Sequence, residues 1–315
     1  MIDFLLRRLT NLIFVILLGS MAVWIMIYTV PGGPEYAIAG ADATEEQREA
    51  VRERLGLDRP LPVQYLSWAE GAVTGDFGKS LTSGKPVAEL LAQRFTATAQ
   101  LIVFTLIIGL AIALPAGTYA AWRYGSPIAH GAAIFQVVLL AFPSFWLGII
   151  LSWYFGLHLG VLPTISDYVP FFSDPWGALR NTILPALTLG LFMAAVLIRF
   201  VRASLADELG KPYITAMRAK GASERNVLVR HALRNAALPI VTVIGLQLGA
   251  FVGGAVVTES IFNYPGVGRL VFLAVTSRDY PVVQGVLMVV VITFALINMG
   301  VDLLYAALDP RIKAK

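Results

Sequence analysis

The chain has 315 residues, of which 57% are hydrophobic and only 14% are charged, and its mean hydropathy is +0.73. A soluble globular domain could not bury so much apolar surface, so this composition excludes one and predicts an integral membrane protein. Cysteine is absent and the three histidines are scattered, which excludes disulfides and argues against a metal site. The net charge of +4 is the sum of unequal loops and does not indicate binding to nucleic acid.

The first apolar run covers residues 9–30 and follows Arg7 and Arg8. Its 22 residues carry no charge, and as a helix such a run spans roughly 30 Å, the thickness of the hydrocarbon core. The alternative is a cleaved signal peptide, because Ala-x-Ala patterns follow Tyr36. The run is longer than the ~7 to 15 residues of a signal core. A transmembrane helix is therefore the favoured interpretation.

Five further apolar runs predict five further transmembrane helices, and so an all-α polytopic membrane protein with six spans. They are residues 97–122, 131–157, 183–198, 238–257 and 282–301. Pro143 and Pro185 lie inside two of these runs and are expected to kink the helices. Six spans place both termini on the same side of the membrane.

The distribution of lysine and arginine predicts the orientation. Fourteen of them lie before the first span, after the second, between the fourth and fifth, and in the tail. Only Arg180, Arg269 and Arg278 lie in the two short loops of the other side. The positive-inside rule therefore places both termini in the cytoplasm. The long first loop, residues 31–96, is expected outside, since long loops cross the membrane with little regard to charge.

This outer loop is expected to contain two helices. Thr44 and Gln47 are spaced as a capping box at the start of one helix, which Gly56 ends. Pro62 suits the first turn of a second helix that continues through Trp68.

A short motif in the same loop resembles part of a nucleotide-binding loop. Gly78, Lys79 and Ser80 match the end of that motif. The motif also needs a strand before it and a glycine five positions before Gly78, where Val73 stands. No nucleotide site is therefore predicted in this chain.

The stretch between the fourth and fifth spans is long, polar and basic. It contains eight basic residues: Arg199, Arg202, Lys211, Arg218, Lys220, Arg225, Arg230 and Arg234. Apolar residues at three- and four-residue spacing predict short helices at residues 211–219 and 223–235, the second capped by Ser223. Gly221 is expected to form the corner between them, because glycine reaches left-handed backbone angles without steric cost.

Two segments of this stretch resemble the cytoplasmic coupling loop of ATP-binding-cassette importer permeases, in particular the dipeptide, oligopeptide and nickel branch. They are residues 213–221 (YITAMRAKG) and 229–239 (VRHALRNAALP). Thr215 stands where the general motif of that superfamily has a glutamate, so a contact that uses this glutamate elsewhere is not expected here. Residues 55–58, 75–80, 259–268, 278–280 and 302–310 are also similar to that family, so the resemblance covers nearly the whole chain.

The resemblance implies a type I importer permease fold, with a transmembrane helix at residues 1–30, an extracytoplasmic region at 31–96, a permease domain at 97–308 that contains the coupling loop 199–237, and a tail at 309–315. It also implies partners: a homologous second permease, two cytoplasmic ATPase subunits that bind ATP and magnesium, and an extracytoplasmic binding protein. The chain itself is expected to bind no cofactor and to catalyse no reaction. Its location is the cell membrane of a prokaryote.

The resemblance further implies three sets of functional residues. The ATPase contact is expected at Thr215, Ala216, Arg218, Lys220, Gly221 and Ala222, and the translocation pathway at Gly245, Gln247, Gly249 and Gly253. Docking of the binding protein is expected at Asp76, Asn263, Tyr264, Pro265, Arg278 and Asp279. The three glycines, at four-residue spacing, also fit simple close packing inside the subunit, and this alternative stays open.

No ionisable side chain lies in the middle of any span, which argues against an ion-coupled carrier or a channel. Because the spans offer no site for a coupling ion, the energy for transport is expected to enter from a partner ATPase through the basic loop. A membrane scaffold without transport activity is a further alternative. Peptide is the expected cargo, with nickel, glutathione or oligosaccharide as alternatives within the same family.

Overall fold

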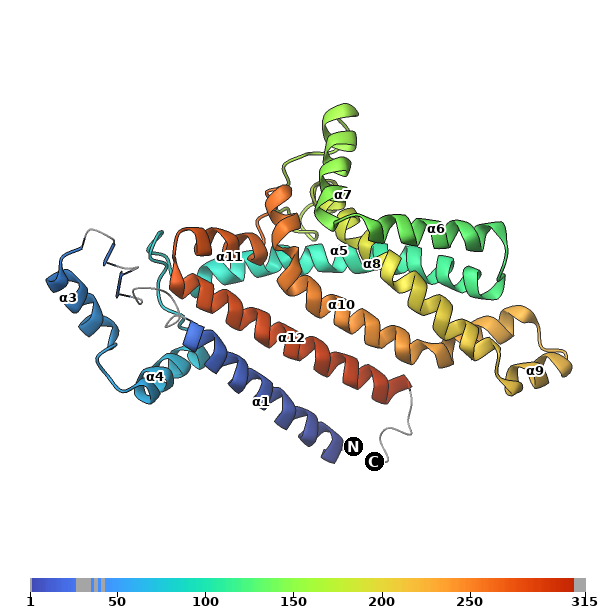
Figure 1. Cartoon of the computed structure of the whole chain (residues 1–315), viewed down its shortest axis with the longest axis horizontal. Coiled ribbons are helices and arrows are strands. Elements are labelled where there is room, and N and C mark those ends of the chain that lie inside the picture. Colours follow the sequence, from blue (N-terminus) through green and yellow to red (C-terminus); the bar gives the residue numbers. More distant parts are fainter. Residues whose placement is uncertain (1, 27–34, 37–38, 41–42, 309–315) are drawn as a thin grey trace. The chain divides into compact units, whose positions relative to one another are not determined.

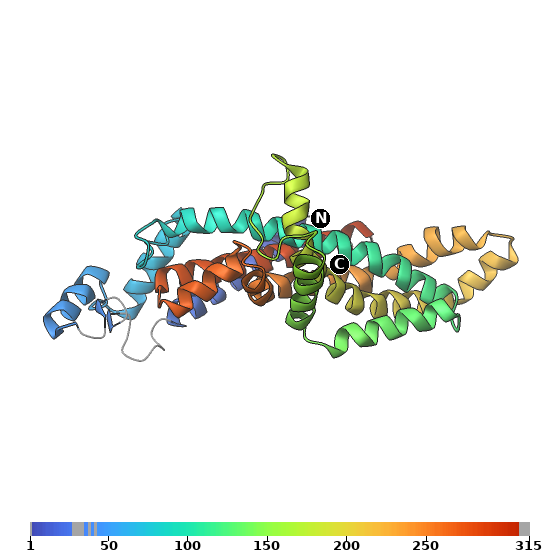
Figure 2. The same ribbon diagram turned by 90° about the horizontal axis from the view of Figure 1, so that it is seen from above.

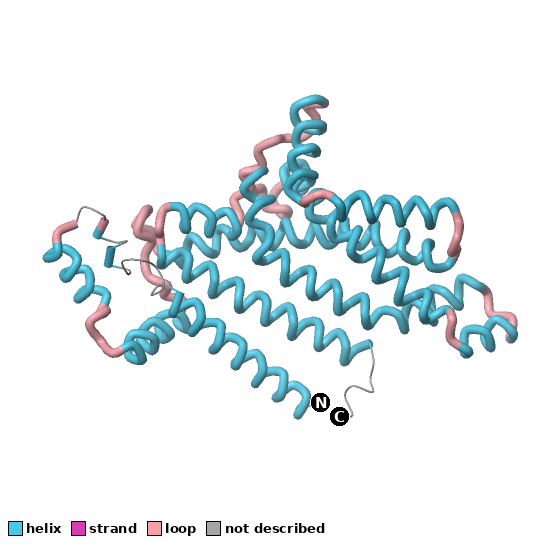
Figure 3. Tube along the Cα trace, in the orientation of Figure 1, coloured by secondary structure: helices cyan, strands magenta, loops and turns pink. Residues whose placement is uncertain are grey.

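The computed structural model describes residues 2–26, 35–36, 39–40 and 43–308. In these residues the chain is helical, without a named strand (Figure 3). The order along the chain is α1 (Ile2–Met26), α3 (Glu45–Leu55), α4 (Leu61–Thr74), α5 (Val87–Trp122), α6 (Pro127–Ala141), α7 (Ser144–Leu151), a π-helix (Ser152–His158), α8 (Pro175–Leu209), α9 (Pro212–Ala219), a second π-helix (Asn226–Ala232), α10 (Leu233–Ile261), α11 (Val267–Thr276) and α12 (Tyr280–Leu308).

The described residues contain five helices that are long and apolar enough to cross a membrane. They are α1, α5, α8, α12 and the helix of residues 226–251 that includes the first part of α10. The bent pair of α6 with α7 and its π-helix supplies a sixth apolar segment. The composition of these helices agrees with the expected all-α polytopic membrane protein. The end of the first predicted span, residues 27–30, and the predicted tail, residues 309–315, lie outside the described residues.

Two compact units can be distinguished in the chain. One contains residues 99–264 and the chain from residue 297 onwards, and the other contains residues 2–98 and 265–296. In the first unit α8 packs against α6, α7 and α10, and Figures 1 and 2 show α8 and α10 running beside each other. In the second unit, α1 contacts α4.

The outer loop has the two predicted helices. Thr44 and Gln47 form the capping box of α3 by two reciprocal hydrogen bonds, and Gly56 ends the helix in the left-handed conformation (φ 65°). The second predicted helix is α4, with a proline in its first turn, but it continues past Trp68 to Thr74. Gly75, with φ 83°, ends it there.

The third predicted span is broken rather than kinked. Phe142 and Pro143 both have extended backbones (ψ 144° and 140°), and α6 meets the following helix at 100°. A proline disfavours the helical conformation of the residue before it, so two consecutive residues leave the helix and the chain turns sharply. By contrast, Pro185 lies inside an unbroken α8.

The helix that contains the fourth predicted span is longer than that span. α8 continues for another 11 residues past residue 198 to Leu209, because no glycine or proline interrupts the basic sequence after Arg199. The short helix expected at residues 223–235 is not separate. Residues 226–232 form a π-helix that leads directly into α10, and no glycine separates the two.

Candidate functional site

The corner predicted at Gly221 has the expected backbone conformation, with φ 81°. The N–H of Ala222 donates to the carbonyl of Met217 (3.1 Å), and the N–H of Gly221 donates to that of Arg218 (3.0 Å). These two bonds are the Schellman pattern that ends a helix with a left-handed residue. They end α9, the helix expected over residues 211–219, and turn the chain towards α10. We call residues 208–224 the coupling elbow.

The elbow has an apolar anchor. Ile214 is completely buried in a cluster that also contains Val201 and Leu205 of α8 and Val227 after the corner. Burying an isoleucine side chain contributes about 1.5 to 3 kcal/mol. The cluster therefore fixes α9 to both helices that flank it.

A polar anchor lies beside it, around the buried carboxylate of Glu208. This carboxylate pairs with Lys211 and accepts a hydrogen bond from the Tyr213 hydroxyl (2.7 Å). The same hydroxyl accepts a bond from the Asn235 amide (3.0 Å). Burial and the bond to Glu208 raise the pKa of Tyr213, and the bond to Glu208 raises the pKa of Lys211. This network was not predicted from the sequence, although Glu208 and Lys211 have the spacing of a helical ion pair.

A second ion pair bridges the corner. The guanidinium of Arg218 donates two hydrogen bonds to the carboxylate of Glu224, at 2.8 and 3.2 Å. This bond, with smaller contributions from Trp122 and Arg123, holds the pKa of Glu224 below its ordinary value. Arg218 was predicted as an ATPase contact, and the structure shows that its guanidinium is already bound inside the chain.

The other predicted coupling residues lie largely on the surface. Thr215, Ala216, Lys220 and Gly221 are exposed, and Ala222 is half-buried against the apolar cluster. Thr215 and Ala216 follow the buried Ile214 directly on α9. The elbow therefore presents one short exposed surface on a base that is fixed by apolar and polar contacts. In Figure 1 it lies where the end of α8 meets the start of the helix that becomes α10.

The predicted pathway glycines on α10 differ in their surroundings. A Cβ at Gly245 would collide with the Val301 side chain of α12, whereas a Cβ at Gly253 would meet nothing within 4 Å. Gly249 is buried and Gln247 is half-buried. Close packing inside the subunit therefore accounts for Gly245, and Gly253 lies on an open surface of this chain.

Some of the predicted docking residues are exposed and others are buried. Asp76, Asn263 and Arg278 are exposed, and Pro265 is half-buried. Tyr264 and Asp279 are buried, as is Glu259, the first residue of the family-like segment 259–268, which lies inside α10. Asn263 and Arg278 have left-handed backbones (φ 53° and 57°), which is uncommon for residues with a Cβ.

Asp279 has a structural role in its own unit. Its carboxylate accepts hydrogen bonds from the Ser80 hydroxyl (2.6 Å), the Leu81 N–H (3.1 Å), and the N–H and hydroxyl of Thr82 (3.3 and 2.9 Å). Burial alone would raise the pKa of Asp279, but these bonds outweigh it and lower the pKa. We call this arrangement of Asp279 with residues 80–82 the outer clasp. Ser80, the last residue of the segment that resembled a nucleotide-binding motif, therefore binds a carboxylate of the chain itself.

Comparison with known proteins covers the whole sequence. Residues 113–314 match the family described as "Binding-protein-dependent transport system inner membrane component", and residues 1–103 match the corresponding N-terminal family. The glutathione transport system permease protein GsiC of Escherichia coli K12 is 42% identical over 316 residues, which cover all of both chains. GsiC of Shigella flexneri serotype 5b is also 42% identical over the full length.

The fold is similar to a solved structure as well. An inward-facing form of the MetNI methionine ABC transporter superposes with a TM-score of 0.56 and 20% sequence identity. The similarity covers 70% of this chain and 96% of the matched chain. This similarity supports the expected type I importer permease fold.

Proposed function

The chain belongs to the family of inner-membrane components of binding-protein-dependent transport systems, and we propose that its coupling elbow transmits ATP hydrolysis by partner subunits to the transmembrane helices. The chain is a permease subunit of an ATP-binding-cassette importer. Further parts of the proposal are a homologous second permease, two cytoplasmic ATPase subunits that bind ATP and magnesium, and an extracytoplasmic binding protein. Both termini lie in the cytoplasm of a prokaryotic cell.

One observation carries the coupling role: the elbow is fixed on its inner side and exposed on its outer side. Ile214 and Tyr213 attach α9 to α8 and to the start of α10. A push on the exposed residues Thr215 and Ala216 would therefore be transmitted to two long helices rather than absorbed by a flexible loop. We place these two residues, with Lys220, in a groove of the ATPase.

Arg218 has a different role in this proposal. Because its guanidinium binds Glu224 on the other side of the corner, it stabilises the shape of the elbow and leaves the direct contact to its neighbours. Ala222 supports the corner from the apolar side.

We propose that the translocation pathway follows the open side of α10 near Gly253. Gly245 belongs to the packing with α12, and Gly249 and Gln247 lie between the two positions. A single cysteine at residue 253 should react with a maleimide in the assembled complex, and substrate should slow this reaction. A cysteine that reacts at the same rate with and without substrate would remove this residue from the pathway.

Docking of the binding protein is assigned to exposed outer residues. Asp76, Asn263 and Arg278 are exposed and Pro265 is half-buried, so their surfaces are assigned to the contact. The buried side chains of Tyr264 and Asp279 act through the shape of the backbone that they fix.

The proposed cargo is a short peptide. The relatives named as glutathione permeases fit this class, because glutathione is itself a small peptide with one unusual linkage. Uptake of labelled dipeptide, tripeptide and glutathione by vesicles that contain the complex distinguishes these cargoes. Uptake of nickel or an oligosaccharide instead would exclude peptide.

The absence of cysteine allows a direct test of topology and assembly. Single cysteines at the exposed residues Ser83 and Ser223 should react with an impermeant maleimide from opposite sides of the membrane. An ATPase subunit should co-purify with the chain. Labelling of both cysteines from outside, or ATP-independent uptake by the purified chain, would contradict the proposal.

A further inference from the structure

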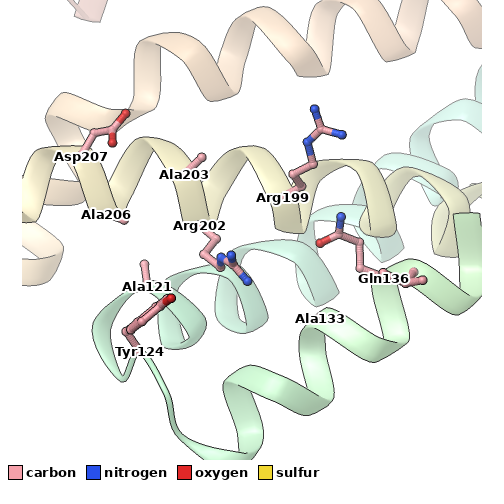
Figure 4. Close-up of a pocket in the computed structure, with 10 residues that line it drawn as sticks. Ala121, Tyr124, Ala133, Gln136, Arg199, Arg202, Ala203, Ala206 and Asp207 are labelled. Carbon is pink, nitrogen blue, oxygen red and sulfur yellow. The ribbon is translucent and has the colours of Figure 1, made fainter.

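A cavity of about 520 Å³ lies in the first unit, between the end of α5, α6 and the second half of α8. Figure 4 shows Arg202 extending from α8 towards the end of α5, Tyr124 after that end, and Gln136 extending from α6 towards α8. Arg199 and Asp207 line it from the same stretch of α8. The remaining lining residues are small or apolar: Ala121, Ala133, Val137, Ala203 and Ala206.

The charge of this cavity is positive. Within the part of the chain that the structure describes, no carboxylate forms an ion pair with Arg199 or Arg202. Asp207 is the one acid among the lining residues, and it interacts with Lys211, whose pKa it helps to raise after the larger effect of Glu208. In Figure 4 the guanidinium of Arg202 lies on the side of Tyr124 and Gln136, whereas that of Arg199 extends from the opposite side of α8 and lies 5.6 Å from the centre of the Phe200 ring. The Arg202 guanidinium therefore remains for an anion, and Arg199 adds positive charge nearby.

A smaller cavity of about 150 Å³ shares Tyr124, Ala133 and Arg202 with the first one and extends it to His130 and Gly125. It lies at the start of α6, where the Ser126 hydroxyl accepts a hydrogen bond from the Ala129 N–H. The positive end of a 15-residue helix thus adds to the attraction of an anion, although α6 alone would not define a site.

The position of the cavity at the ends of two apolar runs indicates that it lies at the membrane interface. Arg199 is the first charged residue after the apolar run 183–198, and Arg123 follows directly after the apolar run 97–122. Trp122 and Tyr124 beside it are the residue types that gather at membrane interfaces. Val137, which lines the cavity, and Ile134 of the same helix are both 64% exposed, as expected for a surface in contact with lipid.

We propose that this cavity binds an anionic phospholipid of the cytoplasmic leaflet. Arg202 contacts the phosphate, the exposed Arg199 on the same stretch of α8 adds positive charge nearby, Tyr124 and Gln136 provide hydrogen bonds to the headgroup, and one acyl chain lies along Ile134 and Val137. Basic pockets between transmembrane helices at the cytoplasmic side are suited to such headgroups. The lipid would stabilise the contact between α6 and the part of α8 that leads to the coupling elbow.

The test uses the full-length chain in its purified complex, delipidated in detergent and titrated with phosphatidylglycerol or phosphatidylcholine in mixed micelles. Native mass spectrometry counts the bound lipids. Phosphatidylglycerol should bind in preference to phosphatidylcholine. The double variant Arg199→Gln with Arg202→Gln should weaken its binding about 30-fold, as expected for the loss of two basic groups at a membrane surface.

The matched control is Arg225→Gln with Arg230→Gln, which removes two charges from the same stretch but from another cavity. This control should bind phosphatidylglycerol as the unchanged protein does. Ala133→Phe, which fills the cavity without removing charge, should also weaken binding and guards against misfolding of the double variant.

Equal binding by the Arg199 and Arg202 double variant, or equal loss in the control, would overturn the proposal. If glycerol phosphate, which has no acyl chains, bound as strongly as phosphatidylglycerol, the cavity would be assigned to a soluble anion. A cavity found covered by the second permease, with no bound lipid, would assign it to the subunit interface. Either result would also contradict a lipid site.

Discussion

Two buried carboxylates fix two different turns, Glu208 in the coupling elbow and Asp279 in the outer clasp. Glu208 binds Lys211 and Tyr213, which are three and five positions away in the sequence. Asp279 binds residues 80–82, which are 197 to 199 positions away. The elbow is therefore held by contacts between near neighbours in the sequence, so it can keep its shape when α8 moves. The clasp instead joins distant segments of one unit.

Removal of the clasp carboxylate should have the largest effect on stability. Asp279→Ala leaves the buried Ser80 hydroxyl, and the part-buried N–H groups of residues 81 and 82 with the Thr82 hydroxyl, without their acceptor, at a cost of about 3 kcal/mol. Thermal unfolding of the purified complex in detergent measures this loss. Asp76→Ala, which removes an exposed acid from the same turn region, is the control and should change little. Equal effects of both variants would show that the clasp contributes no specific stability.

The contribution of Asp279 to stability should also depend on pH. Because the folded-state pKa of Asp279 is lowered, its contribution to stability is present above the unfolded pKa of about 3.9 and is lost as the pH falls through the lower folded value. The stability difference between the unchanged protein and Asp279→Ala should therefore be constant from pH 7 to 5 and shrink below pH 4. A difference that grows on acidification would contradict the assigned hydrogen bonds.

In the elbow, Tyr213→Phe removes one hydroxyl from the polar anchor and keeps the ring. The expected loss of stability is about 1 kcal/mol, smaller than for the clasp, because Lys211 still pairs with Glu208. Transport per ATP hydrolysed should fall more clearly than stability does. Tyr154→Phe, at an exposed tyrosine outside both the elbow and the cavity beside α6, provides the comparison for transport. Unchanged coupling in Tyr213→Phe would show that the polar anchor does not transmit force.

The smallest effect is expected at the exposed pair of Arg218 and Glu224. Both side chains are nearly half exposed, so solvent screens their interaction. Arg218→Gln and Glu224→Gln should each lower coupling slightly, and the double variant should be no worse than either one. If Arg218→Gln abolished ATPase binding while Glu224→Gln did not, Arg218 would be a direct ATPase contact rather than a brace.

The features that were predictable from the sequence are those set by a few neighbouring residues. Thr44 with Gln47 predicted the start of α3, and Gly221 predicted the corner after α9, because caps and left-handed turns depend on local backbone geometry. The resemblance to importer permeases added the location of the elbow. Pro143 predicted a disturbance in the third span, but the angle of 100° depends on the conformations of two residues together.

The features that escaped prediction depend on distant contacts or on the absence of a stop. Nothing in the sequence around Asp279 indicates that its partners are Ser80 and Thr82, nearly 200 positions earlier. Glu259 begins the segment 259–268 that resembles the permease family, and only the folded chain shows it buried within α10. The helical continuation of α8 to Leu209 follows from residues that are compatible with a helix but do not require one.

The central claim is that the elbow joins ATP hydrolysis to transport, and Gly221 tests it most directly. Its φ of 81° is closed to proline, and a Cβ there would meet no other atom within 4 Å, so any defect in a variant comes from the backbone. Gly221→Ala should cost about 1 to 3 kcal/mol of local strain. Gly160→Ala, at another left-handed glycine with open space around it, is the matched control for that strain.

The measurement is uptake of labelled peptide together with ATP hydrolysis stimulated by the binding protein, in vesicles that contain the complete complex. Gly221→Pro should reach the membrane at the normal level, because insertion depends on the apolar helices, yet lose both activities. Gly221→Ala should show a partial loss of both, and Gly160→Ala should retain them. Normal uptake and normal stimulated hydrolysis by Gly221→Pro would contradict the assignment of this corner as the coupling joint.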